Sequence, residues 1–424
     1  MKIAVVGSGI SGLSCAYRLV QAGHDVALFE AGSYFGGHSN TVDVSFDGVT
    51  HGVDTGFLVF NHHTYPHLTA LLDELGVQTA ASEMGFSVKL PVGGRMLEWA
   101  GGNLDQVFCQ RGNLLRPGFL RMLRDILRFN KAATALARGA APQVSLGAYL
   151  DAQGYGAPFR DWYLLPMAAC IWSCPAEQML AFPLASFVQF CSNHGLLQVR
   201  DRPQWRTVVG GSRAYVRRLA AAIPRRYLNT PVLSVQRGPQ AVALRSAHGV
   251  ENFDEVVLAC HSDQSLEVLA DADADQRAVL AAVRYQRNRA VLHTDTGCLP
   301  AERKAWSAWN YQGSGDGERG PRRVCVHYLL NKLQPLPFAQ PLLVSLNPLR
   351  EPDPCLVLRK FDYAHPVFDA AAIAAQRRLH QVQGRDRIWL AGAWTGYGFH
   401  EDGLKSGLAV AAAIAARTQV QRAA

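Results

Sequence analysis

The sequence lacks any C-x-x-C pair, although it holds nine cysteines in 424 residues. Their odd number and wide scatter argue against a disulfide framework or a zinc site, and they favour reduced thiols in a cytoplasmic protein. Long apolar runs are also lacking, because the longest, 408–416, falls short of the ~20 residues that cross a bilayer. We expect no secretory signal, since Met1-Lys2 leads directly into a strand-like run without a cleavage site.

Charged residues are scarce, at 18% of the chain, whereas hydrophobic residues make up 49%. This composition is typical of a globular protein and gives no sign of a long disordered tail. Lysine and arginine exceed aspartate and glutamate by 42 − 34 = 8, which favours an anionic partner without saying which kind. Basic clusters interleaved with aromatic residues are lacking, so we expect no nucleic acid partner.

The most informative pattern lies at the N-terminus. Lys2–Val6 is a β-branched run of the kind buried in a parallel sheet. It leads into Gly7-Ser8-Gly9-Ile10-Ser11-Gly12 and a helical segment from Leu13 to about Ala22, and a second strand, Asp25–Phe29, ends on Glu30. The order of strand, glycine turn, helix, strand and acid predicts a dinucleotide-binding βαβ unit.

Each glycine of this turn has a physical role. Gly7 permits the tight turn, Gly9 lets the backbone approach the pyrophosphate, and Gly12 lets the helix pack closely on the strand. The N-terminus of the helix faces the phosphate charge. Glu30 is placed to accept hydrogen bonds from a ribose diol. The same glycine pattern recurs at 315–320, but no strand precedes it and Pro321 follows, so we interpret that copy as a surface loop.

The residues after Glu30 favour FAD over NAD. Gly36-Gly37-His38-Ser39 follows five residues later, and Glu-x5-Gly-Gly resembles the extended fingerprint of flavoproteins with two dinucleotide-binding domains. Val53–Phe57 resembles the loop that approaches the isoalloxazine ring, although a hairpin turn is the alternative. Residues 229–235 resemble the flavoprotein strand whose valine backbone, here that of Val232, meets the adenine, and 254–260 resembles the strand that returns to the Rossmann sheet.

A matching segment lies near the C-terminus. Arg387–Ala393 is typical of a buried strand that ends in glycine, and 399–407 leads from it into an alanine-rich helix. A strand, a glycine turn and a helix N-terminus can aim backbone N–H groups at the flavin.

Together these segments resemble the flavin-containing amine oxidase superfamily, which includes monoamine oxidase, protoporphyrinogen oxidase and phytoene desaturase. The chain is more closely similar to a bacterial branch of predicted NAD/FAD-binding oxidoreductases, associated with cyclopropane-fatty-acid-synthase-like methyltransferases and modified fatty acids. The segments that carry this resemblance span nearly the full length: 36–42, 53–57, 169–173, 327–334 and 396–403.

The chain departs from the superfamily pattern at two positions. His38 stands where an arginine usually follows the glycine pair, and we expect it to orient the cofactor. Ala393 stands where an acid usually follows the glycine of the last strand, so cofactor hydrogen bonds are expected from Glu401 or Asp402. No cysteine lies in the C-terminal flavin turn, so we predict non-covalent FAD. The residues expected to contact FAD are Gly7, Gly9, Ile10, Ser11, Gly12, Glu30, Ala31, Gly36, Gly37, His38, Ser39, Thr55, Gly56, Phe57, Val232, Ala259, Gly392, Ala393, His400, Glu401 and Leu404.

The resemblance implies an α/β fold in which a substrate domain is inserted into an FAD domain. We expect a Rossmann-like FAD domain of the two-dinucleotide-binding-domain type, formed by 1–80, 200–265 and 380–424. An α+β substrate domain of amine oxidase-like form would comprise 81–199 and 266–379. A chain that crosses between two domains in this way would place the flavin at their junction.

Catalytic residues are harder to assign, because a flavin that accepts a hydride needs little acid–base help. Trp394, Tyr397 and His400 are the candidates, since they lie on the turn expected to carry the flavin ring. Capping of the last helix is the alternative role of His400. The histidines at 51, 62, 63 and 67 lack the carboxylate pairing of a metal site, so we expect no metal.

One predicted helix, at 116–131, bears on the partners. Apolar Phe119, Leu120, Leu123, Ile126 and Leu127 recur at helical spacing, with Arg121, Arg124, Arg128 and Lys131 expected on the opposite side. Such a helix suits the surface of an anionic membrane, so we expect a cytoplasmic protein with possible peripheral contact at the inner face. An ordinary amphipathic surface helix is the alternative.

The leading hypothesis is an FAD-dependent oxidoreductase that oxidises or desaturates a hydrophobic substrate, such as a fatty-acyl chain or another lipid, by hydride transfer to flavin N5. Electrons would leave to O₂, a quinone or a partner protein, because a second strand-flanked dinucleotide motif is lacking. An amine oxidase acting on a small amine is the alternative within the same class. A non-catalytic FAD-binding scaffold or redox sensor is the alternative outside it.

Overall fold

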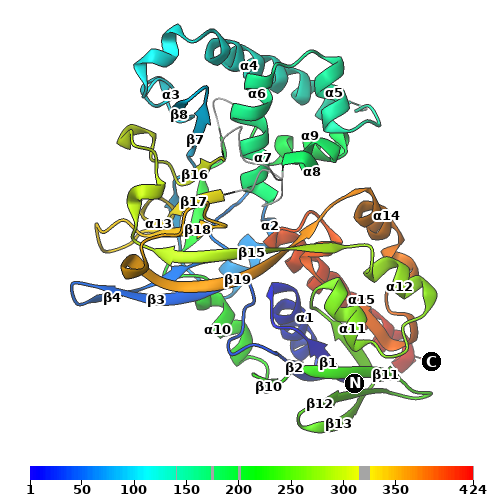
Figure 1. Ribbon diagram of the computed structural model, residues 1–424. Coiled ribbons are helices and arrows are strands. Elements are labelled where there is room, and N and C mark those ends of the chain that lie inside the picture. Colours follow the sequence, from blue (N-terminus) through cyan, green and yellow to red (C-terminus); the bar gives the residue numbers. More distant parts are fainter. Residues whose placement is uncertain (140, 173–175, 199–201, 315–324, 424) are drawn as a thin grey trace.

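The computed structural model describes residues 1–139, 141–172, 176–198, 202–314 and 325–423 (Figure 1). The second glycine pattern, at 315–320, lies outside these residues. The described elements combine a parallel sheet flanked by helices with a second, mixed sheet that carries a helical layer (Figure 1). The α/β class and the Rossmann-like architecture predicted from the sequence are therefore confirmed.

A five-stranded parallel sheet contains the N-terminal strand at its centre. The order of its strands is β10-β2-β1-β14-β20. Their bounds are β1 Lys2–Val6, β2 Asp25–Phe29, β10 Arg225–Tyr227, β14 Glu255–Leu258 and β20 Ile388–Leu390. Strands β1 and β14 are buried along almost their whole length, because other parts of the chain cover both faces of the sheet. Three distant parts of the chain thus supply one sheet.

Helix α1 (Ile10–Gln21) begins at Ile10, three residues before the predicted start at Leu13. It packs against α15 (His400–Ala423), so that the two ends of the chain lie side by side (Figure 1). Two glycines of α15 make this contact close. A Cβ atom on Gly407 would lie 2.2 Å from the carbonyl oxygen of Ser11, and a Cβ atom on Gly403 would lie 3.0 Å from Ile10.

A three-stranded antiparallel sheet follows α10 (Arg213–Ala221) and β10. It consists of β11 (Val232–Arg237), β12 (Val242–Ser246) and β13 (Gly249–Phe253). The sequence predicted only its first strand, because polar residues on the exposed faces of β12 and β13 hide the strand pattern. Helices α11 (Ser262–Val268) and α12 (Ala274–Leu280) come next along the chain, and α11 packs against β11.

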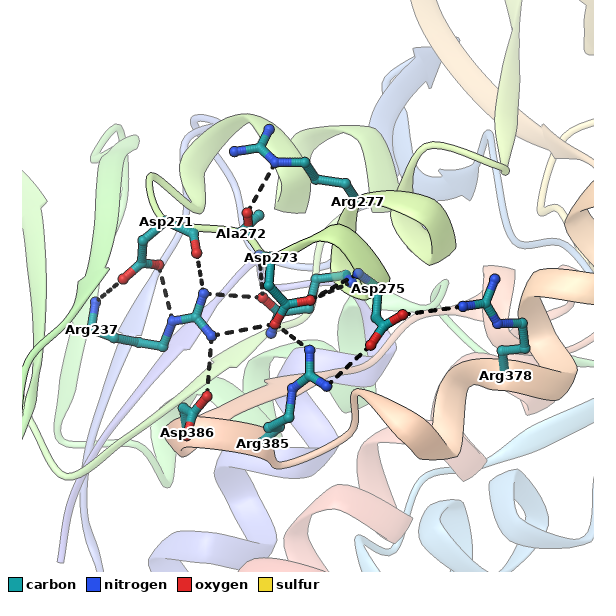
Figure 2. A network of polar contacts seen from close by, with 10 residues as sticks. Arg237, Asp271, Ala272, Asp273, Asp275, Arg277, Arg378, Arg385 and Asp386 are labelled. Atoms are coloured by element: carbon teal, nitrogen blue, oxygen red, sulfur yellow. Dashed lines mark hydrogen bonds and ion pairs between the residues drawn. The ribbon is translucent and has the colours of Figure 1, made fainter.

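A network of ion pairs ties the end of β11 to the segment that enters β20 (Figure 2). Arg237 bonds to Asp271 at 3.1 Å and lies 3.4 Å from Asp386, while Arg385 bonds to Asp273 at the N-terminus of α12. Asp386 and its neighbour Arg387 have positive φ angles of 48° and 70°, which residues other than glycine rarely adopt. The network therefore holds a strained turn immediately before β20.

The second large sheet has seven strands in the order β19-β15-β18-β17-β16-β7-β8. All neighbours are antiparallel except β7 and β16. The bounds are β7 Phe86–Val92, β8 Arg95–Ala100, β15 Arg284–His293, β16 Trp309–Gln312, β17 Cys325–Leu329, β18 Leu343–Leu346 and β19 Val357–Val367. Helix α13 (Leu330–Leu333) follows β17, and α14 (Ala370–Arg378) follows β19.

A helical layer lies beyond this sheet at the top of Figure 1. It comprises α3 (Leu104–Val107), α4 (Pro117–Arg138), α5 (Leu146–Ala152), α6 (Ala157–Phe159), α7 (Leu165–Trp172), α8 (Ala176–Ala181) and α9 (Leu184–Asn193). Helical structure continues through 157–172 although this stretch contains Pro158 and Pro166. Pro158 lies in the first turn of α6, and a π-helical stretch, Arg160–Leu164, precedes Pro166.

Helix α4 turns a different face outward from the one expected. Phe119 and Met122 are buried as a core stripe, but Leu120 and Leu127 are exposed on the side that carries the arginines. The inward face also includes Asp125 and Phe129, so the buried stripe is rotated around the helix relative to the predicted one.

Short elements join the two sheets. A hairpin of β3 (Thr41–Phe46) and β4 (Val49–Asp54) turns at Asp47-Gly48, so Val53–Phe57 does not form the hairpin turn. A small sheet contains β5 (Phe60–Asn61), β9 (Trp205–Val208) and β6 (Thr79–Ser82), and α2 (Pro66–Glu74) packs on α15. Buried Asp54 accepts two hydrogen bonds from the backbone N–H and hydroxyl of Ser212, and so fixes the hairpin to α10.

The boundaries of the two domains follow from these elements as a proposal. The strands of the parallel sheet, with α1, α10 and α15, come from the segments expected for the FAD domain, 1–80, 200–265 and 380–424, whereas α12 and α14, which also pack against this sheet, lie in 266–379. The seven-stranded sheet and the helical layer come from 81–199 and 266–379. We propose that the chain divides into a Rossmann-like domain and an inserted domain at these limits.

The contact between α1 and α15 leads to a test of stability. We expect Gly407→Ala to lower the free energy of unfolding by about 2 kcal/mol, because the new methyl group would meet the backbone of Ser11, which cannot rotate away. The expected change is a net effect, in which a steric cost of about 3 kcal/mol is partly offset by the ~1 kcal/mol that alanine gains over glycine inside a helix. Urea denaturation followed by circular dichroism measures the difference.

Gly112→Ala is the matched control, since a Cβ atom at Gly112 meets nothing within 4 Å. It should leave the urea midpoint unchanged. An unchanged or raised midpoint for Gly407→Ala would show that the two helices are not in close contact there.

Candidate active site

One large cavity lies at the carboxyl ends of the parallel strands. Its volume is about 1580 Å³, and its lining includes the residues that follow β1, β2, β14 and β20. Small-molecule sites usually measure ~300–1,000 Å³, so this cavity has room for more than one ligand. It extends from the glycine turn at Gly7 to aromatic residues of the seven-stranded sheet, such as Trp309 and Tyr328.

The N-terminus of α1 opens into one end of the cavity. Gly9 is its N-cap residue, with no capping side chain, and the first turn contains no acidic residue. Ile10 and Ser11 line the cavity, and a Cβ atom on Gly9 would project into open space. Gly7 has a φ of 99°, and a Cβ atom on Gly12 would lie 1.9 Å from the carbonyl oxygen of Gly7. The free N–H groups and the helix dipole at this point suit a phosphate.

The carboxylate of Glu30 lies beside this helix terminus. It accepts hydrogen bonds from the backbone N–H of Ser8 at 2.9 Å and from that of Gly32 at 2.7 Å. The Ser8 hydroxyl also donates to it at 2.5 Å. Glu30, Ala31, Val232 and Ala259 all line the same end of the cavity, so the structure brings the residues predicted for the adenosine half together.

The glycine pair passes directly under the helix terminus. The backbone N–H of Gly36 donates to the carbonyl oxygen of Ser8 at 3.0 Å, and a Cβ atom on Gly37 would lie 3.3 Å from Gly9. Gly56 is equally confined, because its Cβ atom would lie 2.3 Å from the carbonyl oxygen of His38. All of these residues line the cavity.

His38 belongs to a group of neutral histidines in the middle of the cavity. Its ring stacks on Tyr363 with centroids 4.9 Å apart and lies 5.1 Å from the ring of His365. Burial, together with His365, holds the pKa of His38 well below its usual range, and burial lowers the pKa of His365 to about 4. Tyr363 and His365 both lie on β19. Their local sequence does not mark them as site residues, because it does not show which strand will lie against His38.

His400 is held by a chain of hydroxyl groups. The hydroxyl of Ser39 lies 2.5 Å from that of Tyr215, and Tyr215 lies 2.9 Å from Nε2 of His400. The imidazole stacks on Phe57 with centroids 3.9 Å apart. Burial lowers the pKa of His400 to about 3, so the ring is neutral at physiological pH. The side chain faces the cavity and does not cap the last helix.

The other two catalytic candidates occupy different surroundings. Trp394 is almost fully buried beneath the parallel sheet, although it also touches the cavity. Tyr397 belongs to an aromatic wall, with its ring centroid 6.2 Å from that of Phe190. Phe190 in turn stacks on Phe399 at 4.9 Å and on His194 at 3.9 Å. Trp394 and Tyr397 therefore do not face each other as a pair.

Three predicted cofactor residues do not line the cavity: Gly12, Glu401 and Leu404. A cofactor contact of Glu401 stays a prediction, and its carboxylate accepts the backbone N–H groups of His67 and Leu68 at 2.8 and 3.0 Å. It therefore caps the N-terminus of α2, where it also bonds Nδ1 of His67 at 2.7 Å. Asp402 accepts the N–H groups of Tyr397 and Phe399, and so shapes the preceding turn.

The far end of the cavity is predominantly aromatic and apolar. Its lining there includes Phe86, Trp99, Tyr163, Met167, Cys170, Ile171, Trp172, Trp306, Trp309 and Tyr328. Among the described lining residues the carboxylates are Glu30, Glu267 and Glu83, and only Glu83 lies toward this end. Its carboxylate is already paired with the ammonium group of Lys332 at 2.8 Å. The lining thus favours a hydrophobic ligand over a cation.

A possible metal group lies elsewhere in the seven-stranded sheet. Ligand atoms of His293, Cys298 and His327 lie within 4.8 Å of one another. The hydroxyl of Ser345 bridges the two rings, 2.6 Å from Nε2 of His293 and 2.6 Å from Nδ1 of His327. Because the N–H of Asp295 donates to Nδ1 of His293, Nε2 carries the ring proton and offers no lone pair to a metal. We therefore assign no metal to this group.

Comparison with known proteins supports a flavoprotein. The model of the family described as flavin containing amine oxidoreductase matches residues 10–307. A Mycobacterium tuberculosis protein assigned to the flavin-containing monoamine oxidases, AofH, is 26% identical over 61% of this chain and 56% of its own. The zeta-carotene desaturase of Synechocystis is 37% identical over 18% of this chain and 15% of its own. The chain thus spans little more than half the length of the monoamine oxidase relative.

Solved structures show the same fold at low identity. Cyclohexylamine oxidase from Brevibacterium oxydans has a TM-score of 0.71 at 17% identity, with 99% of both chains covered. A fatty acid isomerase from P. acnes that produces CLA has a TM-score of 0.67 at 14% identity, covering 97% of this chain and 98% of its own. At these identities the likeness concerns the fold alone, and it extends over nearly the whole chain.

The contact between the Glu401 carboxylate and the N-terminus of α2 leads to a prediction. We expect Glu401→Gln to lower the free energy of unfolding by about 1–3 kcal/mol, because an amide cannot accept both backbone N–H groups of α2 as the carboxylate does. The amount of bound flavin should not change, since Glu401 does not line the cavity. Thermal denaturation and the visible absorbance of the purified protein measure the two effects.

Glu351→Gln, which alters an exposed ion pair with Arg289, is the matched control and should change neither quantity. If Glu401→Gln loses flavin at unchanged stability, the side chain of Glu401 contributes to cofactor binding and the present prediction is contradicted.

Proposed function

The chain belongs to the family of flavin containing amine oxidoreductases, and we propose that it is an FAD-dependent oxidoreductase that oxidises or desaturates a hydrophobic, fatty-acyl or other lipid substrate. The observation that carries this proposal is the composition of the cavity. One end has the features of a dinucleotide site, and the other is aromatic and apolar, with its one carboxylate already paired. The narrower bacterial branch named from the sequence stays a prediction.

FAD is the cofactor of this family, and the described residues fit it. The uncapped N-terminus of α1 suits the diphosphate, the open space at Gly9 admits it, and Glu30 suits the ribose. We propose that the cavity-lining residues predicted from the sequence bind FAD, with Gly12 acting only through helix packing. Bound FAD would accept a hydride from a C–H bond held against its N5 atom.

The protein's part in the reaction is positioning and the exclusion of water. Burial lowers the pKa of His38, of His365 and of His400, so these partly buried rings are neutral and can hydrogen-bond to a flavin without adding charge. The Ser39–Tyr215–His400 chain fixes the orientation of the His400 ring. We propose that His400 is a positioning residue, and that Tyr397 and Phe399 form the wall against which the substrate lies.

The amine oxidase alternative rests on the family and on AofH. A cationic amine in a buried site needs a free carboxylate or an aromatic cage. In the described part of the cavity Glu83 is paired with Lys332, and Trp394 does not face Tyr397. These observations favour the hydrophobic substrate. The alternative of a non-catalytic scaffold does not explain why the cavity has a large apolar end in addition to the dinucleotide site.

We propose a cytoplasmic location with peripheral contact at an anionic membrane, where acyl chains reside. The eight cysteines among the described residues are free, and none of the described helices is long and apolar enough to cross a bilayer. O₂, a quinone or a partner protein would receive the electrons. No nucleic acid is proposed as a partner.

The substrate class is tested by reduction of the bound flavin. Under anaerobic conditions we expect fatty-acyl or lipid extracts to bleach the visible flavin band and polyamines to leave it unchanged, because the apolar end lacks a free carboxylate. Met167→Trp, which fills that end, should slow bleaching at least tenfold with the flavin content retained. Met96→Trp, on the surface, is the matched control.

Bleaching by amines alone would overturn the lipid proposal in favour of an amine oxidase. Bleaching by neither class would favour the scaffold.

The attachment of the cofactor is tested separately. We expect acid precipitation to release all of the flavin, because no cysteine lies in the 392–400 turn. Cys170 and Cys260 line the cavity, but burial raises the pKa of Cys260 to about 11 and that of Cys170 well above its usual range, so both are unreactive thiols. A yellow pellet after precipitation would contradict this prediction.

A further inference from the structure

Exposed leucines gather at the end of the molecule farthest from the chain termini, over α3 and α4 (Figure 1). Leu115 is 88% exposed, Leu104 76% and Leu127 61%, and Leu114 and Leu120 are also exposed. Side chains of this size normally pack inside a protein, and five of them within 24 consecutive residues, 104–127, form an unusual surface. We call this surface the leucine face.

Basic side chains surround the leucine face. Arg111, Arg121, Arg124, Arg128 and Lys131 are all exposed. Two acidic residues lie among these five basic ones: Asp105 is paired with Arg111 and Lys304, and the buried Asp125 is paired with Arg121, Arg124 and Arg128 at 3.9, 3.8 and 3.5 Å. The exposed surface therefore carries a net positive charge next to apolar side chains. Leu120, Arg121 and Arg124 also border a shallow groove.

The cavity reaches the surface beside this face. Gly101 and Gly102 line the cavity and are themselves exposed, and Gln106 of α3 lines it too. Leu104 lies between these residues in the chain. Trp306, which follows Lys304, the partner of Asp105, also lines the cavity. The apolar end of the cavity therefore reaches the surface next to Leu104.

We propose that the leucine face docks on the surface of an anionic phospholipid bilayer and holds this opening against the acyl region. The leucines would enter the interface, and the arginines and Lys131 would contact lipid phosphates. That a lipid substrate enters by this opening rests on the proposed function, whereas the docking itself does not depend on any reaction.

The charge of the face favours a bilayer over a second copy of the chain. Two leucine faces brought together would place like charges opposite each other in a partly dehydrated contact, which is unfavourable. An anionic lipid surface instead supplies the opposite charge over an area of any extent, and it accepts leucine side chains in its apolar layer. Arginine is well suited to this position because its guanidinium group matches phosphate geometry.

The test is co-sedimentation of the flavin-loaded protein with vesicles. One set contains phosphatidylcholine alone, and the other contains phosphatidylcholine with phosphatidylglycerol. We expect binding to the anionic vesicles that weakens as salt is raised, and at least tenfold weaker binding to the neutral ones. The variant Leu104→Ser/Leu115→Ser/Arg121→Gln/Arg124→Gln should lose at least tenfold in affinity for anionic vesicles, with unchanged flavin content.

Arg245→Gln/Val250→Ser is the matched control, since it removes one exposed charge and one exposed apolar side chain on the β12–β13 hairpin, at the opposite end of the molecule (Figure 1). It should bind vesicles as the unmodified protein does. Equal binding by the four-residue variant, or no preference for anionic vesicles, would overturn the proposal. So would a dimer in sedimentation velocity that the variant abolishes, because a second copy would then occupy the face.

Failure of docking and failure of the proposed function give different results. Flavin bleaching by detergent-dispersed lipid without vesicle binding would refute only the docking. Vesicle binding without any bleaching by lipid would retain the docking and refute the substrate proposal.

Discussion

The close packing of α1 is the constraint on which the rest of the structure depends. On one side Gly12 brings the helix against the turn after β1, and on the other Gly403 and Gly407 let α15 lie directly on it. These contacts leave no room for a Cβ atom. They fix the N-terminus of α1 at the carboxyl edge of the parallel sheet, where its free N–H groups can meet an anion.

The large cavity follows from this arrangement. The chain leaves the parallel sheet after β2 and again after β14 to build the seven-stranded sheet and its helical layer, and it returns through β10 and β20, the two outer strands of the parallel sheet. Space therefore remains between a polar, glycine-rich edge and an aromatic, apolar wall. The polar part of the cavity suits the dinucleotide portion of a flavin, and the apolar part suits a hydrophobic substrate. The two molecules would lie end to end in one cavity.

The neutral histidines and the ion-pair network are two uses of polar groups in this fold. Desolvation lowers the pKa of the partly buried His38, His365 and His400, so they stay neutral near the proposed flavin position. Arg237 and Arg385 instead form ion pairs that hold the turn before β20 in place (Figure 2). Outside both regions, the leucine face combines exposed apolar and basic side chains, as an interface with lipid requires.

The sequence by itself determined the local features of this protein. The order of strand, glycine turn, helix and acid at residues 2–30 needs only neighbouring residues, and the parallel sheet formed as its pattern predicts. Tertiary structure alone decided the contacts between distant segments. Glu401 caps α2 and His365 meets His38 because of how whole sheets and helices pack, and no local pattern encodes such partners. The exposure of Leu120 and Leu127 and the burial of Asp125 likewise depend on which face of α4 packs against the rest of the helical layer.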